Sequence, residues 1–544
     1  MIERIAFLSA DRLAKAFACA YFAIICFVGL APNKAPELFG RTLLCLSITY
    51  AFFFGHTDFP SLLFNRRNVL LFFLVQLVGW ALLIPVEYYA FEFSNFDTGI
   101  FANQVLLWKE TGEYYTSVLG MHAFADHFTP NLLAFAPLYL LWNSFLWMPI
   151  VKVVAWAWSV YLLIGFSIDV LGKDSRYRYF VPGIYLLNQF VANTMLMEFQ
   201  PSSLAMPFII LAFRLAYQQK LGLLLVVLVT LLGFKEHLGV VWISVGLFLA
   251  LERQRPFLGC MLITIGAAEG LLVYQWLMPL FSSAAIHHDS RIAPLVAVGK
   301  KLGLMAQAVL SFGALPALTR YGLLYALPGF VLVLMGGDSV MIGFKHHYHD
   351  AGFALLACSS VLGLRYLKKL ATSRSAAAKA VSSAIVVIVL AQGVRFPTYF
   401  IRREWPSSAQ IALHQELETA KEVIKRYAPH EIWTLDHLGP YLFDQHNLKS
   451  LLNPVLPPRK PEVSRRLVLV SSLVNTYPLT STQYEALMSH LTATYTEMNS
   501  SSSPKSTLRI FISKKRPLIA PLFQNAALSF NKKRPKHLVH PHGH

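Results

Sequence analysis

The ionisable residues of segment 92–130 are the first candidates for chemistry. Asp97 stands in the run NFDTGIF, and Asp126 and His127 stand together in the run DHFTP. A carboxylate at a membrane surface could accept a proton from a hydroxyl group or hold a metal ion. Asp97 could instead cap the amphipathic pattern over 100–108. Asp126 and His127 could bind phosphate or a divalent metal together with Asp97, or could only order a polar turn.

Further polar residues stand in or next to apolar runs. Gln104 follows Asp97 by one or two helical turns, Glu198 stands in MEFQP, and Lys235 and Glu236 stand in KEHLG. One explanation of two charged residues in this apolar neighbourhood is an internal ion pair between Lys235 and Glu236 or another carboxylate. A lysine is also a good point-charge partner for phosphate. Glu198 could equally be satisfied locally at a helix end.

The run KHHYHD is the densest polar cluster, and its histidines are His346, His347 and His349. Consecutive histidines often fail to converge on one ion, and no CxxC or HExxH spacing accompanies them. Contacts to a phosphate or diphosphate are therefore preferred, and a metal is the secondary interpretation. The polar loop 277–302 could be a lid or a solvated connection.

The elements that must position these residues are membrane helices. The chain has 544 residues, of which 55% are apolar and only 14% are charged, whereas soluble domains have about 25% charged residues. Its net charge of +18 comes mainly from basic loops between apolar runs, which is the positive-inside signal. No aromatic-interleaved basic motif, P-loop or Rossmann pattern is present, so we expect no nucleic-acid partner. The five cysteines lie in apolar runs and predict no disulfide.

Apolar runs predict about 13 crossings of the bilayer. The basic residues Arg4, Arg12 and Lys15 near the first run favour a cytoplasmic N-terminus. The expected spans are 13–31, 42–55, 69–90, 150–170, 179–195, 203–217, 221–234, 238–251, 257–276, 303–318, 321–336, 351–365 and 380–396. The run 131–148 is bounded and broken by prolines, so we expect a juxtamembrane or re-entrant helix there rather than a crossing. This arrangement keeps the basic loops inside and gathers the polar clusters outside.

Composition changes after residue 402, and 403–530 is polar enough for a small α/β domain outside the membrane. We expect helices over 409–427 and 482–496, and strands over 432–435, 466–471 and 508–513. The basic tail 531–544 is expected to be disordered.

Six motifs occur in a fixed order: FDTGIFANQ, DHFTP, EFQPSSLAMPF, KEHLG, HHYHDAGFALL and DHLGPYLFDQH. Together they resemble a family of uncharacterised bacterial polytopic membrane proteins, which is itself similar to the GT-C glycosyltransferase superfamily. That pattern has a histidine where this chain has Gln200 and an acid where it has His237. The resemblance implies an all-α, GT-C-like membrane domain over 1–402, with segment 92–130 as the catalytic outer loop.

The resemblance also implies a function. GT-C enzymes transfer a sugar from a polyprenyl-phosphate donor to an extracytoplasmic acceptor, here a glycan, lipid or protein of the cell envelope. Asp97 would then take the position of the catalytic carboxylate and act as general base on the acceptor hydroxyl, and Lys235 with the histidines of 346–349 would bind donor phosphate. The expected location is the bacterial inner membrane, with the C-terminal domain outside. The alternative is a transporter or flippase for a lipid-linked or anionic solute.

Overall fold

The computed structural model describes residues 64–281, 293–337, 342–344, 347–372, 405–451, 465–476, 478–499 and 507–513. The expected spans 13–31, 42–55 and 380–396 and the tail 531–544 lie outside these residues. The chain divides into two compact units. Unit 1 runs to Ile84 and contains His122–Pro137 and Leu146–Glu404, whereas unit 2 contains Pro85–Met121, Leu138–Phe145 and the chain from Trp405 onward.

The helices of the first half of the chain are α4 (Arg66–Tyr89), η2 (Asn95–Gly99), α5 (Ile100–Thr111), α6 (Ala123–Asp126), η3 (Pro130–Phe135), α7 (Leu138–Leu141), α8 (Trp147–Leu171), α9 (Phe180–Leu187), α10 (Gln189–Leu196), α11 (Pro201–Tyr217), α12 (Leu221–Leu232) and α13 (Gly239–Leu251). They are followed by α14 (Pro256–Leu272), η4 (Val273–Leu277), α15 (Met278–Leu280), α16 (Val298–Ser311), η6 (Leu315–Leu318), α17 (Gly322–Ala326), η7 (Leu327–Phe330), α18 (Val331–Met335), η8 (His347–His349) and α19 (Asp350–Thr372). The C-terminal part adds α22 (Ser408–Tyr427), η9 (Asp436–Leu442) and α23 (Ser481–Thr494). The strands are β1 (Tyr115–Thr116), β2 (Met121–His122), β3 (Glu431–Thr434), β4 (Leu448–Ser450), β5 (Arg466–Ser471), β6 (Tyr495–Asn499) and β7 (Leu508–Ser513).

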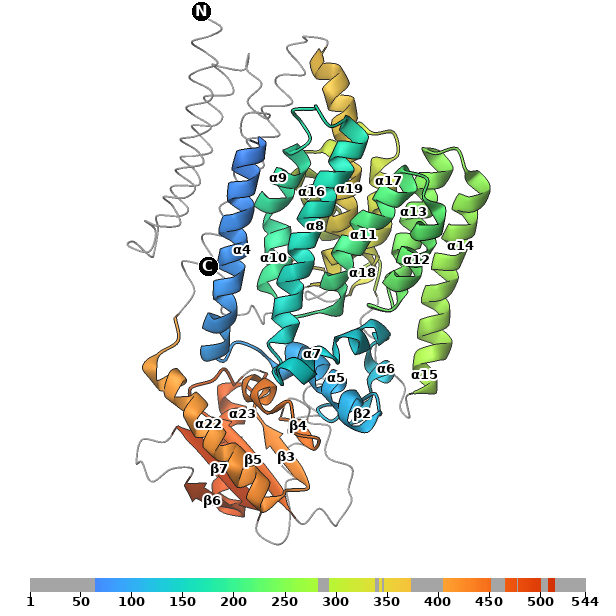
Figure 1. Ribbon diagram of the computed structural model, residues 1–544. Coiled ribbons are helices and arrows are strands. Elements are labelled where there is room, and N and C mark those ends of the chain that lie inside the picture. The colour runs from blue at the N-terminus through green and yellow to red at the C-terminus, as the bar shows by residue number, and fades with distance from the viewer. Residues whose placement is uncertain are drawn as a thin grey trace, which may run out of the picture. The chain divides into compact units, whose positions relative to one another are not determined.

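Unit 1 is a helical bundle in which α8, α11 and α19 pack against one another (Figure 1). In the described part of the chain, four helices are long and apolar enough to cross a membrane: Arg66–Tyr89, Trp147–Leu171, Pro256–Leu280 and Asp350–Lys368. The last of these is the most deeply buried in the bundle, and Pro256–Leu280 is the least. Shorter apolar helices stand at several other predicted spans, so the count of about 13 crossings stays a prediction.

Glycine pairs bring α13 and α14 into close contact. A Cβ at Gly246 would lie 2.6 Å from the main-chain oxygen of Gly259, and a Cβ at Gly266 would lie 2.5 Å from that of Gly239. Only residues without a side chain allow two helix backbones to approach this far. This hairpin carries the loop 233–238 at one end of α13.

Three expected helices are interrupted. In place of a single helix over 131–148, the structure has η3, α7 and then the start of α8. The expected span 179–195 is divided at Asn188, whose side chain accepts hydrogen bonds from the amides of Phe190 and Val191 and so caps α10. The span expected over 321–336 is divided into α17, η7 and α18, with Pro328 in the middle piece.

Unit 2 contains a five-stranded sheet in the order β4-β3-β5-β7-β6. β3 pairs in parallel with β4 and β5, and β7 pairs antiparallel with β5 and β6. The helix α22 runs across the sheet (Figure 1) and buries Leu413, Leu417, Ala420 and Ile424. The α/β character of the C-terminal region is as predicted, although the short strand β4 and the edge strand β6 were not expected.

Candidate functional site

The centre of the candidate site in unit 1 is the turn between α10 and α11. Lys152 of α8 is 3% exposed, and its Nζ donates to the main-chain oxygens of Met195 at 3.1 Å, Met197, and Glu198 at 3.3 Å. These bonds use the three hydrogens of the ammonium group. The buried cation therefore holds the turn that carries Glu198 and Gln200.

The DHFTP and KEHLG motifs come together beside this turn. His127 donates from Nδ1 to Oε1 of Glu236 at 3.0 Å, and the amide of Phe128 donates to Oε2 of the same carboxylate at 3.2 Å. The amide of Asn131 donates to the main-chain oxygen of Gly233 at 2.9 Å. Both oxygens of Glu236 are thus occupied by one segment, which satisfies a carboxylate that is only 5% exposed.

Lys235 connects the KEHLG and EFQP motifs. Its Nζ donates to Oε1 of Gln200 at 2.9 Å, and the two residues are 2% and 3% exposed. A glutamine amide oxygen is an acceptor whose capacity does not depend on protonation, so Gln200 can partner the ammonium group of Lys235 over a wide pH range.

Asp350, at the start of α19, joins the two helices that flank the turn. Thr194 donates to its Oδ1 at 2.8 Å, and Ser202 donates to its Oδ2 at 3.1 Å. Because Thr194 directs its hydroxyl hydrogen at Asp350, its oxygen can only accept from the Nε2 of His349, which lies 3.3 Å away. Lys152 and Lys235 both act electrostatically on this carboxylate. The turn is therefore surrounded by two lysines and one buried aspartate.

The charges of the loop residues are set by their neighbours. Burial opposes a charge on His127, but the carboxylates of Asp126 and Glu236 outweigh it and raise the pKa of His127. Burial likewise opposes a charge on Glu236, yet His127 and Lys235 hold the pKa of this carboxyl below its usual range. Burial lowers the pKa of His237 to about 4, so this ring is neutral at pH 7. The pair His127–Glu236 is consequently ionic near neutral pH.

Asp97 and Gln104 belong to unit 2. Asp97 is half-buried and lies inside the helical turn η2, which continues directly into α5. The N-cap residues of η2 and α5 are Ser94 and Gly99. Asp97 is therefore not a helix N-cap, which was the alternative to a catalytic role. Gln104 is fully buried, and neither of its amide atoms has a hydrogen-bond partner among the described residues.

Two predicted residues are only partly described. His346 lies outside the described residues, and only the backbone of His347 is placed, in η8. In the ranges that the structure describes, no group of three histidine, cysteine, aspartate or glutamate side chains could hold a metal ion. The Nε2 of His127 lies 4.0 Å from the nearer carboxylate oxygen of Asp126. The bond to Glu236 described above is made by His127.

Sequence reasoning did not single out Lys152, Thr194 or Ser202, and it gave Asp350 no role of its own. Lys152 had a readable signal, because it is a charged residue within the apolar run 150–170. Thr194 and Ser202 had no such signal in the sequence, since serine and threonine are common in membrane helices. Their role depends on α10, α11 and α19 meeting in space.

Comparison with known proteins gives the family. The model of DUF2079, described as "Predicted membrane protein", matches residues 87–442. No curated protein matches the sequence. Two solved structures of ArnT from Cupriavidus metallidurans are similar, each at 10% identity: one bound to undecaprenyl phosphate, with a TM-score of 0.47 over 82% of this chain and 98% of that chain, and one in the apo state, with a TM-score of 0.46 over 81% and 97%. Because the family model covers more than half of the sequence, the chain belongs to the DUF2079 family of predicted membrane proteins.

Proposed function

We propose that the protein is a membrane glycosyltransferase of the bacterial inner membrane. It transfers a sugar from a polyprenyl-phosphate donor to a cell-envelope acceptor on the extracytoplasmic side. The observation that carries the proposal is the buried cationic group of unit 1, in which Lys152 and Lys235 flank one turn. The ordered motifs that resemble the GT-C superfamily supply the reaction class.

The proposed phosphate-binding residues are Lys235 and His127. When the sugar leaves, the lipid phosphate gains negative charge, and fixed cations in a low-dielectric site stabilise such a charge strongly. Lys152 is assigned a different role, because its three hydrogens are directed at main-chain oxygens. It orders the turn, while Lys235, held by Gln200, is proposed to contact the donor phosphate.

Asp97 remains the proposed general base, on the grounds of its motif and its half-buried carboxylate. It would accept the proton of the acceptor hydroxyl as the bond from that oxygen to the sugar forms and the bond from the sugar to the phosphate breaks. Proton transfer by a positioned side chain contributes about 10²- to 10⁴-fold to a rate. A divalent metal is not required by this scheme.

The test uses the full chain in lipid nanodiscs with a panel of polyprenyl-phosphate sugars. Release of polyprenyl phosphate is measured, because this product is common to every donor in the panel. Asp97→Asn should lower the rate by about 10²-fold or more, and Lys235→Met by about 10²- to 10³-fold. Glu113→Gln is the control for the acid, since Glu113 is an exposed residue of the same loop.

Lys301→Met is the control for the lysine, because Lys301 is also 3% exposed but donates to Ala293 and Pro294 instead. Full activity of Asp97→Asn would remove Asp97 as the base. Movement of the lipid-linked sugar across a vesicle membrane without release of polyprenyl phosphate would instead identify a flippase.

A further inference from the structure

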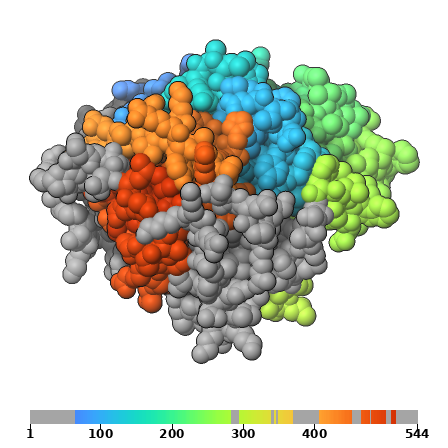
Figure 2. Space-filling model, turned by 90° about the horizontal axis from the view of Figure 1, so that it is seen from below, coloured from blue at the N-terminus to red at the C-terminus, as the bar shows by residue number. Residues whose placement is uncertain are grey.

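The DHLGPYLFDQH motif has no role in the proposed chemistry, yet it lies against the segment that carries Asp97. Both segments belong to unit 2, although about 340 residues separate them in sequence. The motif forms η9 (Asp436–Leu442), all of whose residues are buried, and η9 packs on η2. Figure 2 shows the blue surface of the early segment beside the orange surface of the C-terminal one.

One contact is made next to the proposed base itself. The amide of Phe96 donates to Oδ1 of Asp436 at 3.0 Å. Asp436 is 3% exposed, so its carboxylate is a fixed acceptor rather than a solvated one. The peptide group between Asn95 and Phe96, one residue before Asp97, is therefore held by a side chain of the C-terminal domain.

A second contact fixes the other side of the turn by shape. Asn95 is fully buried and lies between two glycines. A Cβ at Gly99 would stand 2.4 Å from its Oδ1, and a Cβ at Gly439 would stand 2.3 Å from its Cγ. Neither amide atom of Asn95 has a hydrogen-bond partner among the described residues. Asn95 is thus held by close packing against η9, and Gly439 is the residue that makes room for it.

A third group of contacts holds the entry to the turn, where Phe91 has a φ of +56°. A bulky residue in this conformation is strained and persists only when its surroundings hold it there. Here His437 donates from Nδ1 to the main-chain oxygen of Phe91 at 3.0 Å. The rings of His414 and Tyr441 lie with their centres 4.3 and 4.6 Å from that of Phe91. The hydroxyl of Tyr441 also donates to the main-chain oxygen of Tyr88 at 2.6 Å.

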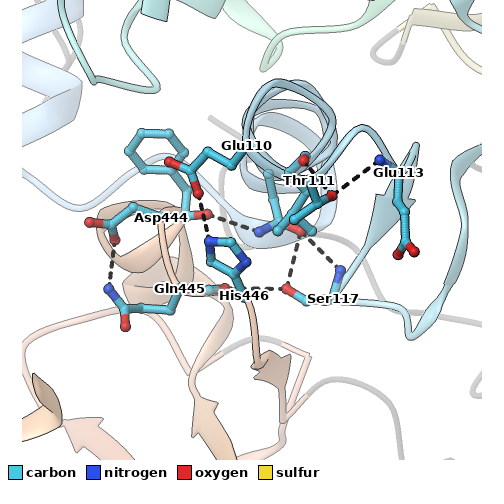
Figure 3. Close-up of polar contacts among 10 residues, drawn as sticks. Glu110, Thr111, Glu113, Ser117, Asp444, Gln445 and His446 are labelled. Atoms are coloured by element: carbon cyan, nitrogen blue, oxygen red, sulfur yellow. Dashed lines mark hydrogen bonds and ion pairs between the residues drawn. The ribbon is translucent and has the colours of Figure 1, made fainter. Parts of the chain in front are cut away.

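Farther from Asp97, the described residues of the two segments also make ordinary polar contacts. Figure 3 shows Glu110 and Ser117 reaching His446 and Gln445, with His446 Nε2 2.6 Å from the Glu110 carboxylate. Lys449 donates to the main-chain oxygen of Ser117 at 2.8 Å. These contacts join the same two segments about 13 to 20 residues away from Asp97, so they provide matched controls.

We infer that η9 is a positioning element for Asp97, with Asp436 and Gly439 holding the turn in which the proposed base stands. The inference rests on the proposed function for the role of Asp97. It adds that the C-terminal domain is needed for the geometry of the base and not only for binding an acceptor. A displacement of about 1 Å at a catalytic group can lower a rate by about 10²-fold.

The test compares three variants of the full chain in nanodiscs. Asp436→Ala removes the acceptor of the Phe96 amide, Asp436→Asn keeps an oxygen there, and Lys449→Met removes the distant contact to Ser117. Hydrogen exchange of the amides in 94–99 reports the turn directly and needs no activity. Exchange should rise in Asp436→Ala and stay near the wild-type rate in the other two variants.

The kinetic arm separates positioning from a general loss of stability. Asp436→Ala should lower kcat by about 10²-fold with KM within twofold, and Asp436→Asn should restore most of kcat. Gly439→Ala reaches the same turn by displacing Asn95 and should also lower kcat with little change in KM. If Asp436→Ala does not fold, Gly439→Ala provides the kinetic test in its place.

Two results would overturn the inference: unchanged exchange over 94–99 in both Asp436→Ala and Gly439→Ala, or raised exchange with an unchanged kcat. A failure of the proposed function looks different. In that case Asp97→Asn keeps full activity, while the exchange data still decide whether η9 holds the turn.

Discussion

Replacing Lys152 with methionine tests how far one buried ammonium group holds the candidate site together. The lysine is 3% exposed and donates to the main-chain oxygens of Met195, Met197 and Glu198. Methionine has a similar length but no charge and no donor. The three carbonyl groups lose the cation that orders the turn between α10 and α11.

The magnitude follows from these bonds. A hydrogen bond from a charged donor contributes about 1.5–3 kcal/mol, so three such bonds contribute about 4.5 kcal/mol at the lower end. The loss is partly offset, because the variant no longer buries an ammonium ion and its desolvation costs several kcal/mol. We expect the free energy of unfolding to fall by about 3 kcal/mol when this offset is subtracted from the contribution of the three bonds.

Lys301→Met is the matched comparison. Lys301 is equally buried but donates to two main-chain oxygens, those of Ala293 and Pro294, each at 3.0 Å. Two such bonds among the described residues contribute about 3 kcal/mol. The desolvation offset of an equally buried ammonium group is the same, so we expect a net loss of about 1.5 kcal/mol. Reversible unfolding in mixed micelles, followed by tryptophan fluorescence, measures both variants against the wild type. Transfer activity should fall in Lys152→Met, because Gln200 follows the turn, and should persist in Lys301→Met.

Either of two outcomes would refute this reasoning. Lys152→Met could unfold within about 0.5 kcal/mol of the wild type, the range of an ordinary surface substitution. Alternatively, Lys301→Met could lose more stability than Lys152→Met. Both results would show that the number of carbonyl contacts does not set the contribution of a buried lysine in this bundle.

Two further predictions concern the pairing of the DHFTP and KEHLG motifs. Gly233→Ala should destabilise the protein by about 1–3 kcal/mol, since its Cβ would lie 2.3 Å from Oδ1 of Asn131. Gly222→Ala is the control, because its Cβ would have no atom within 4 Å, and it should be neutral or slightly stabilising. Equal thermal unfolding temperatures of the two variants would contradict this prediction. The raised pKa of His127 means that the His127–Glu236 pair contributes stability that is fully present below the ordinary pKa of 6.5 and is lost as the pH rises through the raised value. The thermal unfolding temperature of His127→Gln should therefore lack this part of the pH dependence. If the unfolding temperatures of the variant and the wild type change equally with pH, the His127–Glu236 pair does not contribute to stability.

The sequence alone determined the class of the protein and the approximate place of its strongest elements. The helices α4 and α8 stand where runs 69–90 and 150–170 predict them, and β5 and β7 begin and end at the predicted residues. These elements could be read because their hydrophobic pattern is local and long enough to exclude alternatives. The motifs also marked Lys235, Glu236 and His127 as site candidates, since charge is expensive in an apolar chain.

Only the tertiary structure decided which of these residues meet. The break at Asn188 is set by a side chain that caps α10 and also donates to Ser311, 123 residues away. The strand β6 is polar and exists because β7 pairs with it, so its sequence carries no strand signal of its own. Lys152 became a structural cation because α8 passes the turn at 197–200, and Asp436 became a partner of the Asp97 turn because the chain returns there. Such pairings depend on contacts between distant segments, which no local pattern encodes.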